Sequence, residues 1–282
     1  MRKGSDKAVF LALILLAITP RIIFSITRDL RIHFINVGQG DCVLIQTPNG
    51  RNILVDAGYL EDVSKRILYI RNLGIKRFDV VIGTHPHSDH IGGMAQIIHE
   101  LDIGQVYLPE VVANTLVFQD LLLSIQAKEL KVEKARAGTT IILDSAIQII
   151  FLAPLGDIYG NLNDYSAVVK ITYGKTSFLL TGDAGVLSEE EMIQSGADLK
   201  SDVLKVGHHG GGDATSFSFL EKVAPKYAVI SVGLGNSYGH PDKETLDRLA
   251  LFGISVFRTD VDGTICFISD GKTIGAQKQL LD

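Results

Sequence analysis

The chain has 282 residues, of which 46% are hydrophobic and 21% are charged. These values are ordinary for a globular protein and exclude a disordered, collagenous or coiled-coil chain. Only two cysteines occur, Cys42 and Cys266, and neither forms a Cys-x-x-Cys pair, which excludes a thiolate zinc finger. The net charge is −5, and because residues 1–31 carry six basic and two acidic residues, the remainder carries −9. A surface that coats nucleic acid without regard to sequence is therefore not expected.

The first 28 residues have the pattern of an export segment. Arg2, Lys3 and Lys7 precede an apolar run over residues 8–18, which Pro20 and Arg21 interrupt soon after its end. A basic start before a short apolar run is typical of a signal peptide, and 11 residues fall short of the roughly 20 that span a bilayer. The alternative, a buried or amphipathic helix, fits less well because the run is apolar on all faces.

We therefore expect two regions with different fates. Residues 1–28 are predicted to be a signal peptide or an N-terminal membrane anchor, and residues 29–282 a single folded domain. The domain would then be secreted or held on the outer face of the cytoplasmic membrane.

Strand-like and helix-like segments are interleaved along this domain, and strands predominate. Strands are predicted, in chain order, near residues 31–37, 42–47, 52–58, 78–84, 140–143, 147–153, 165–173, 176–181, 202–206, 227–232, 254–258 and 264–269. Helices are predicted near residues 61–73, 91–101, 115–129, 185–195, 215–224 and 242–252. This order favours a two-sheet core flanked by helices.

The segment that carries the chemistry follows the buried strand at 78–84. It reads THPHSDHIGG and places His85, His87, Asp89 and His90 within six residues. In an extended loop, residues i and i+2 point the same way, so the first two imidazoles can share one metal. The other two side chains begin the next helix and can face a second metal. Imidazole and carboxylate groups are ligands of Zn²⁺, Mn²⁺ and iron.

This His-x-His-x-Asp-His pattern resembles the signature of the metallo-β-lactamase superfamily. Three further segments resemble the family's other motifs in the same order: LVDAG with Asp56, LTGD with Asp183, and KVGHHGG with His208. The resemblance spans about residues 31–270. It implies an αββα sandwich of two mixed β-sheets flanked by helices, with a site for two divalent metal ions, Zn²⁺ or Mn²⁺, at one edge.

Within the superfamily, the resemblance is narrower still. Residues 33–41, 205–211, 238–241 and 258–260 are similar to segments of the hydrolase domain of ComEC-type competence proteins. In that family the domain is normally fused to a membrane-spanning DNA channel, and it is proposed to degrade the strand that is not imported. The likeness implies a phosphodiester substrate, DNA among the candidates, and a membrane DNA-uptake or envelope partner. The oligomeric state stays open.

The resemblance also implies roles for the site residues. The expected metal ligands are His85 and His87 for the first ion, Asp89, His90 and His208 for the second, and Asp183 bridging both. Two such ions can lower the pKa of a bridging water, and the resulting hydroxide attacks phosphorus or a carbonyl carbon without a side-chain nucleophile.

Other residues are expected to support or contact the substrate. Asp56 is expected to orient His85 or its loop without binding metal. His209 and His240 are candidates to stabilise the substrate oxyanion or to protonate the leaving group. Lys205 and Ser166 are weaker candidates for contact with phosphate.

The sequence departs from the β-lactamase pattern at one ligand. The third histidine of the first metal site has no counterpart, and an Asn-x-x-Ser segment with Asn163 stands in its place. Its amide oxygen could bind the metal, or water could take the position, and either shifts preference toward harder ions such as Mn²⁺. Asp41, between two predicted strands, could reach the site or belong to a simple turn.

Two other functions remain open at this point. The same metals could hydrolyse a small phosphodiester, a carboxylic ester, a thioester or a lactam. A domain that had lost catalysis could serve as a binding module, but loss of metal ligands would be its sign, and the ligand motifs are present.

Overall fold

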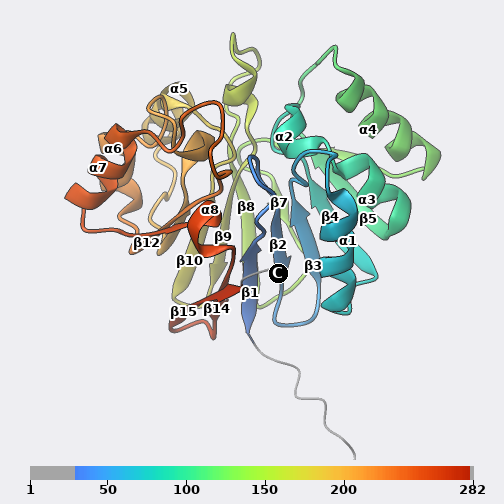
Figure 1. Cartoon of the computed structure of the whole chain (residues 1–282), viewed down its shortest axis with the longest axis horizontal. Coiled ribbons are helices and arrows are strands. Elements are labelled where there is room, and N and C mark those ends of the chain that lie inside the picture. Colours follow the sequence, from blue (N-terminus) through green and yellow to red (C-terminus); the bar gives the residue numbers. More distant parts are fainter. Residues whose placement is uncertain (1–28, 280–282) are drawn as a thin grey trace, which may run out of the picture.

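Side chains alternate between two buried environments along the strands of the computed structural model, which describes residues 29–279. In β2 (Val43–Gln46), Val43 and Ile45 join the core between the two sheets, whereas Leu44 joins a second core beneath helices. This alternation is what a strand requires when both of its faces are covered. The result is four layers, with helices outside and two sheets face to face (Figure 1).

The first sheet has eight strands. Their order across the sheet is β15 (Ile274–Gln279), β14 (Thr264–Ser269), β1 (Leu30–Phe34), β2, β3 (Asn52–Val55), β4 (Arg77–Ile82), β5 (Asp102–Leu108) and β6 (Val132–Lys134). The run from β3 to β6 is parallel and the rest is antiparallel, so the sheet is mixed.

The second sheet has seven strands. Their order is β13 (Ser255–Arg258), β12 (Tyr227–Ile230), β11 (Val203–Lys205), β10 (Thr176–Leu180), β9 (Val168–Tyr173), β8 (Ile147–Ala153) and β7 (Thr140–Ile141). Here β10 to β13 are parallel and β7 to β10 antiparallel.

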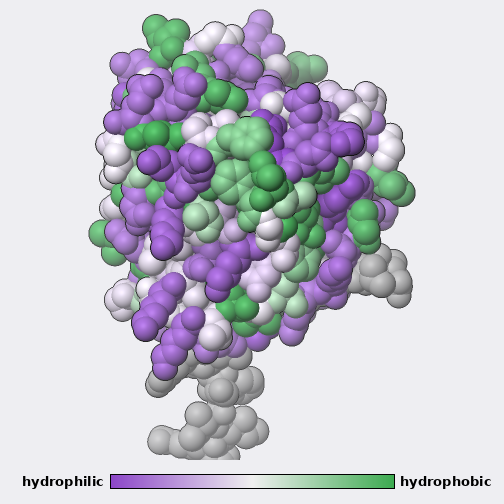
Figure 2. Space-filling model, turned by 90° about the vertical axis from the view of Figure 1, so that its left-hand side faces the viewer, coloured by the Kyte–Doolittle hydropathy of each residue, from purple (hydrophilic) through white to green (hydrophobic). Residues whose placement is uncertain are grey.

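Helices cover the outer face of each sheet. On the first sheet lie α1 (Val63–Asn72), α3 (Met94–Glu100) and α4 (Leu116–Ala127), and on the second α5 (Val186–Gln194), α6 (Phe217–Val223) and α7 (Lys243–Leu251). The shorter elements are α2 (Ser88–Ile91), α8 (Thr259–Asp262) and the 3₁₀ turns η1 (Leu162–Tyr165) and η2 (Gly207–Gly210). Figure 2 views the molecule over α6 and α7, where apolar side chains lie in small groups among polar ones.

The predicted αββα sandwich of two mixed sheets is therefore confirmed. The predicted helix at 91–101 is interrupted at Gly92, where an added Cβ would lie 2.8 Å from the backbone nitrogen of Leu60. The strand predicted from residue 165 begins at Val168, because Tyr165 belongs to η1 and two residues separate that turn from the strand. The strands β5, β6 and β15 were not predicted.

No helix within residues 29–279 is both long and apolar enough to cross a membrane. The predicted signal peptide or anchor at residues 1–28 lies outside the described residues. Both cysteines, Cys42 and Cys266, are buried free thiols.

One buried histidine of β1 gives the fold a defined pH dependence. His33 is 2% exposed, and its Nδ1 lies 2.8 Å from the Tyr69 hydroxyl. Burial lowers the pKa of His33 from 6.5 to about 4. The unfolded chain therefore binds a proton between pH 6.5 and pH 4 that the folded chain does not, so stability falls as pH falls through this range.

Because of His33, we expect the free energy of unfolding to fall by about 2.5 kcal/mol as the pH is lowered from 7 to 4.5. Urea unfolding of the wild type and of His33→Gln at both pH values measures it, because other acid-sensitive groups contribute equally to both proteins. The same pH dependence in the two proteins would contradict the assignment.

Candidate metal centre

The site lies where parallel strands of both sheets end. The loops that follow β3, β4, β10 and β11 meet at one edge of the sandwich, the upper edge in Figure 1, where α2 begins. Carboxyl ends of parallel strands are where ligands bind in open α/β sheets, because the loops there converge. Each sheet thus contributes part of the site.

Two groups of ligand atoms share one carboxylate. Asp89, His90, Asp183 and His209 form the first group, with all ligand atoms within 4.8 Å of one another. His85, His87 and Asp183 form the second. Asp183 belongs to both, as expected of a bridging ligand.

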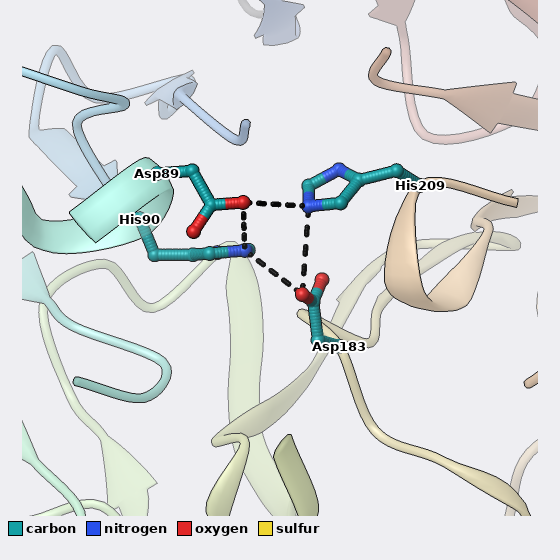
Figure 3. Close-up of side chains that lie close together, drawn as sticks. All are labelled: Asp89, His90, Asp183 and His209. Atoms are coloured by element: carbon teal, nitrogen blue, oxygen red, sulfur yellow. Dashed lines mark ion pairs between the residues drawn. The ribbon is translucent and has the colours of Figure 1, made fainter. Parts of the chain in front are cut away.

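The ligand atoms of the first group form a ring of short contacts that includes the shared oxygen. Asp183 Oδ2 lies 3.1 Å from His90 Nε2 and 3.4 Å from His209 Nε2. Asp89 Oδ2 closes the group at 3.2 Å from His209 Nε2, and Figure 3 shows the four side chains converging. In the second group the same Asp183 oxygen lies 3.7 Å from His85 Nε2.

The charge state of the second group also suits a cation. His85 Nε2 and His87 Nδ1 lie 2.9 Å apart. Burial and the neighbouring His90 hold the pKa of His85 well below its usual value, and burial also lowers the pKa of His87. Both rings are therefore neutral at physiological pH, which is the form of imidazole that binds metals.

Carboxylates hold the first group in the opposite state. Burial alone would lower the pKa of His209, but Asp183 and Asp89 raise it to about 9. Burial would raise the pKa of Asp183, yet His209 and His90 hold it well below its usual value. The imidazoles and carboxylates of this group thus stabilise each other's charged forms.

Buried atoms without hydrogen bonds indicate that the residues present fit a metal. His90 Nε2, His209 Nε2 and Asp183 Oδ1 make no hydrogen bond within residues 29–279, and the two nitrogens have only ion-pair contacts with carboxylates. Leaving a buried polar atom unpaired costs about 1–3 kcal/mol, so such atoms usually serve a ligand. Nitrogen and carboxylate oxygen donors suit Zn²⁺, Mn²⁺ or iron.

Asp56 stabilises the HxHxDH loop through contacts with Thr84 and His90. It follows β3 in a left-handed conformation, with φ of 57°. Its carboxylate accepts hydrogen bonds from the backbone N–H of Thr84 at 2.8 Å and from the Thr84 hydroxyl at 2.6 Å, and it contacts His90 Nδ1 at 2.7 Å. Asp56 therefore contacts His90 directly. It reaches His85 only through Thr84 Oγ1, which lies 3.1 Å from His85 Nδ1.

Three other predicted residues, Asp41, Ser166 and Lys205, are buried next to the ligand groups. Lys205 is 1% exposed, and its ammonium group contacts Asp41 Oδ2 at 2.6 Å and the Gly182 carbonyl at 2.8 Å. Ser166 is also buried, and its hydroxyl accepts from the Asp183 N–H at 3.0 Å and lies 3.3 Å from His85 Nδ1. Lys205 and Ser166 thus hold site residues in place and are closed off from an incoming phosphate.

The backbone at Asp41 explains why glycine precedes it. Gly40 has φ of 122°, and an added Cβ would lie 2.2 Å from the carbonyl oxygen of Asp89. The Asp41 N–H donates to that same oxygen at 3.1 Å. Only glycine allows the 38–41 turn to pack this closely against α2.

The two neighbouring histidines of η2 point in different directions. Both have left-handed backbone angles, with φ of 47° at His208 and 53° at His209. His209 points into the first ligand group, whereas His208 Nδ1 lies 2.8 Å from Asp213 Oδ1 and its Nε2 lies 3.3 Å from Asn163 Nδ2. The geometry therefore favours His209 over His208 as the ligand from this segment.

Asn163 keeps a free oxygen. Its Oδ1 is buried without a hydrogen-bond partner in the described part of the chain. This atom remains a candidate ligand or water contact, as the sequence predicts.

A pocket of about 240 Å³ opens from the metal centre toward solvent. Its lining residues include Gln39, Tyr59, His208, Tyr238 and His240. His240 thus lies on the wall of the pocket, and its ring centroid lies 5.4 Å from that of His208.

We expect the two η2 histidines to differ in their effect on metal content. His209→Ala removes a nitrogen of the first ligand group and should lower the bound metal by about half. His208→Ala should retain the metal, because His208 contacts Asp213 and Asn163 instead. Metal analysis of both purified variants, each the other's positional control, makes the comparison. The reverse result would restore His208 as the ligand.

Comparison with known proteins finds related sequences. The chain is 29% identical over 251 residues to ComE operon protein 3 of Bacillus subtilis, covering 83% of this chain and 32% of that protein. It is 30% identical over 236 residues to competence protein ComA of Neisseria gonorrhoeae, covering 82% of this chain and 31% of that protein. The chain thus spans about a third of the length of these relatives.

Solved structures share the fold. The metallo-β-lactamase fold protein YhfI from Bacillus subtilis aligns with a TM-score of 0.55 at 15% identity, covering 82% of this chain and 96% of that one. CmlA, a diiron β-hydroxylase from Streptomyces venezuelae, aligns with a TM-score of 0.56 at 14% identity, covering 89% and 54%. At such identities the likeness concerns the fold alone.

The sequence profile described as the metallo-beta-lactamase superfamily, whose members are generally metal-dependent hydrolases, matches residues 35–233. That range runs from the end of β1 to the loop after β12 and includes every residue of both ligand groups. By this match over well more than half its length, the chain belongs to the metallo-β-lactamase superfamily.

Proposed function

We propose that this chain is a metal-dependent phosphodiesterase that cleaves nucleic acid, with DNA as its substrate. The observation that carries the proposal is the Asp183 carboxylate shared by two groups of ligand atoms beside an open pocket. The similarity to competence proteins supports a nucleic-acid substrate over other hydrolysable bonds.

The side chains of the two groups would hold two divalent cations, Zn²⁺ or Mn²⁺. When bound, such ions neutralise charge on a phosphodiester and lower the pKa of a coordinated water. This positive charge is needed because the body of the protein carries −9 and would otherwise repel a polyanion.

Two histidines on the pocket wall, His208 and His240, are candidates for proton transfer. Asp213 raises the pKa of His208 by its hydrogen bond to Nδ1, which favours the protonated form of this ring beside the pocket. A protonated imidazole can donate to the oxygen of a departing group. We assign this role to His208, with His240 next to it, because His209 points into the ligand group.

We further propose that the domain works outside the cytoplasmic membrane, secreted or anchored, beside a membrane DNA-uptake or envelope partner. The support is the basic and apolar pattern of residues 1–28 and the likeness to competence proteins. Protease treatment of intact cells tests the location, since an inward-facing domain would resist digestion.

The activity is tested on purified protein with labelled single- and double-stranded DNA in Mn²⁺, Zn²⁺, Mg²⁺ or EDTA. Asp89→Ala should abolish cleavage, whereas Asp247→Ala, an exposed carboxylate of α7, should not. Cleavage that requires metal and is lost only in Asp89→Ala supports the proposal and identifies the metal.

Other outcomes point elsewhere. Hydrolysis of bis-p-nitrophenyl phosphate without DNA cleavage would move the substrate to a small phosphodiester. No turnover of either by protein with two metals bound would contradict a phosphodiesterase. Hydrolysis of a lactam or thioester would then favour a carbonyl substrate, and its absence a binding module.

A further inference from the structure

An aromatic pair stands at the mouth of the metal pocket. The rings of Tyr238 and His240 lie nearly parallel, with an interplanar angle of 9° and centroids 5.9 Å apart. Tyr238 is 60% exposed although it lines the pocket. A large aromatic side chain that remains exposed at the entrance of a site has apolar area available for a ligand.

The pair is joined to the metal centre by further rings. His240 lies 5.4 Å from His208, and His208 lies 6.2 Å from His209, centroid to centroid. His209 belongs to the ligand group. A planar group stacked on Tyr238 would therefore lie in the same pocket as the ligand group.

The loop that carries the pair is held in place by one asparagine. Asn236 Oδ1 accepts from the backbone N–H groups of Tyr238 at 3.2 Å and His240 at 3.1 Å. Asn236 Nδ2 donates to the carbonyls of Gly233 at 2.9 Å and His240 at 2.7 Å. These four bonds fix both aromatic residues before a ligand arrives, which lowers the entropic cost of binding.

Residues that follow strands of the first sheet also contact the loop with the aromatic pair. An added Cβ at Gly233 would lie 2.6 Å from the backbone nitrogen of Gln39, and Gln39 Oε1 accepts from the Gly233 N–H at 3.1 Å. Tyr59, which follows β3, is hydrogen-bonded to Tyr238 and Ser88. The aromatic pair is thus fixed relative to the HxHxDH loop, which also lines the pocket.

We propose that Tyr238, backed by His240, is a stacking platform for the nucleobase next to the scissile phosphodiester. The inference rests on the proposed function and narrows it to substrates with an unpaired base at that position. Every base has a flat face, so the platform accepts different bases, and a base within a duplex cannot reach it without leaving its stack. Single-stranded ends and gaps are then preferred over intact duplex.

Gln39 is placed to contact the same ligand. Its side chain lines the pocket, and its Nε2 is buried with no hydrogen-bond partner in the described residues. A donor in this position can bind an oxygen of the sugar or the base once Tyr238 holds the ring.

The first test uses binding and needs no turnover. The chain contains no tryptophan, so Tyr238→Trp introduces a single fluorescent reporter at the platform. In Zn²⁺ buffer, thymidine 5′-monophosphate should quench it at concentrations where ribose 5-phosphate does not. Leu251→Trp, on the exposed face of α7, is the matched control and should respond to neither. Equal quenching by both ligands, or none by either, would overturn the platform.

The second test separates the platform from the phosphodiesterase activity. Thymidine 5′-(p-nitrophenyl phosphate) and methyl p-nitrophenyl phosphate share a leaving group, and only the first carries a base. Tyr238→Ala should lower kcat/KM about tenfold or more for the first and leave the second unchanged, while Tyr238→Phe retains both.

The two possible failures can be told apart. An equal loss on both substrates would overturn the stacking role. If wild-type protein hydrolyses neither substrate, the proposed function fails, and the quenching result alone decides whether the platform exists.

Discussion

Replacing Asp183 by asparagine should lower the rate of phosphodiester cleavage by about 10³-fold or more and reduce the bound metal. The reason is the position of Oδ2, which lies within 3.7 Å of nitrogens from His85, His90 and His209. Among the described residues, no other side chain belongs to both groups. An amide keeps the shape of the side chain but loses the negative charge that two cations require.

The measurement is a pair of assays on Asp183→Asn, metal content and cleavage, with Asp247→Asn as the exposed control. Circular dichroism checks that the variant is folded, because the substitution leaves the buried imidazoles of His90 and His209 without one of their carboxylate partners. Retention of both metals and of most activity would contradict a bridging role.

Replacing Asp56 by alanine should lower the free energy of unfolding by about 3–5 kcal/mol. The substitution leaves the Thr84 N–H, the Thr84 hydroxyl and His90 Nδ1 without their buried partner. It also removes the group that orients His90, so metal affinity should fall by about 10–100-fold.

Urea unfolding and competition with a metal chelator measure the two effects. Asp56→Asn is the informative companion, because asparagine tolerates the left-handed backbone at this position but can no longer accept on both sides. We expect it to keep more stability than alanine and still to lose metal affinity. An alanine variant with wild-type stability would show that water replaces the carboxylate.

Most of the site could be predicted because its residues follow buried strands. His85, His87, Asp89 and His90 follow the largely apolar β4, and their spacing predicts the two groups of ligand atoms to which they belong. Asp183 likewise comes within three residues of the end of β10. The resemblance then supplied the order of the motifs and the sandwich fold.

What the sequence could not resolve depends on backbone conformation. His208 and His209 are adjacent and chemically identical, and only their two left-handed conformations determine which ring enters the ligand group. Nothing in the local sequence predicts such angles for two non-glycine residues. Lys205 was placed near phosphate by its motif, yet its pairing with Asp41 requires a contact between the two sheets.

Two of the three unpredicted strands, β5 and β15, were missed for a related reason. In β5, polar and glycine residues interrupt the apolar pattern, and Gly104 is needed because a Cβ would lie 2.5 Å from the Asp79 carbonyl. β15 is exposed along most of its length, so it carries little hydrophobic signal. Both are strands through pairing with neighbours and not through local preference.

The direction of β1 bears on how substrate reaches the enzyme. The strand begins at Leu30 and ends at Phe34, just before the turn with Gln39 and Asp41 that borders the pocket. Any tether through the residues that precede Asp29 would therefore hold the domain by the end opposite its active site. Under the proposed anchoring, the mouth of the pocket would face away from the bilayer, and substrate would be captured from the surrounding medium.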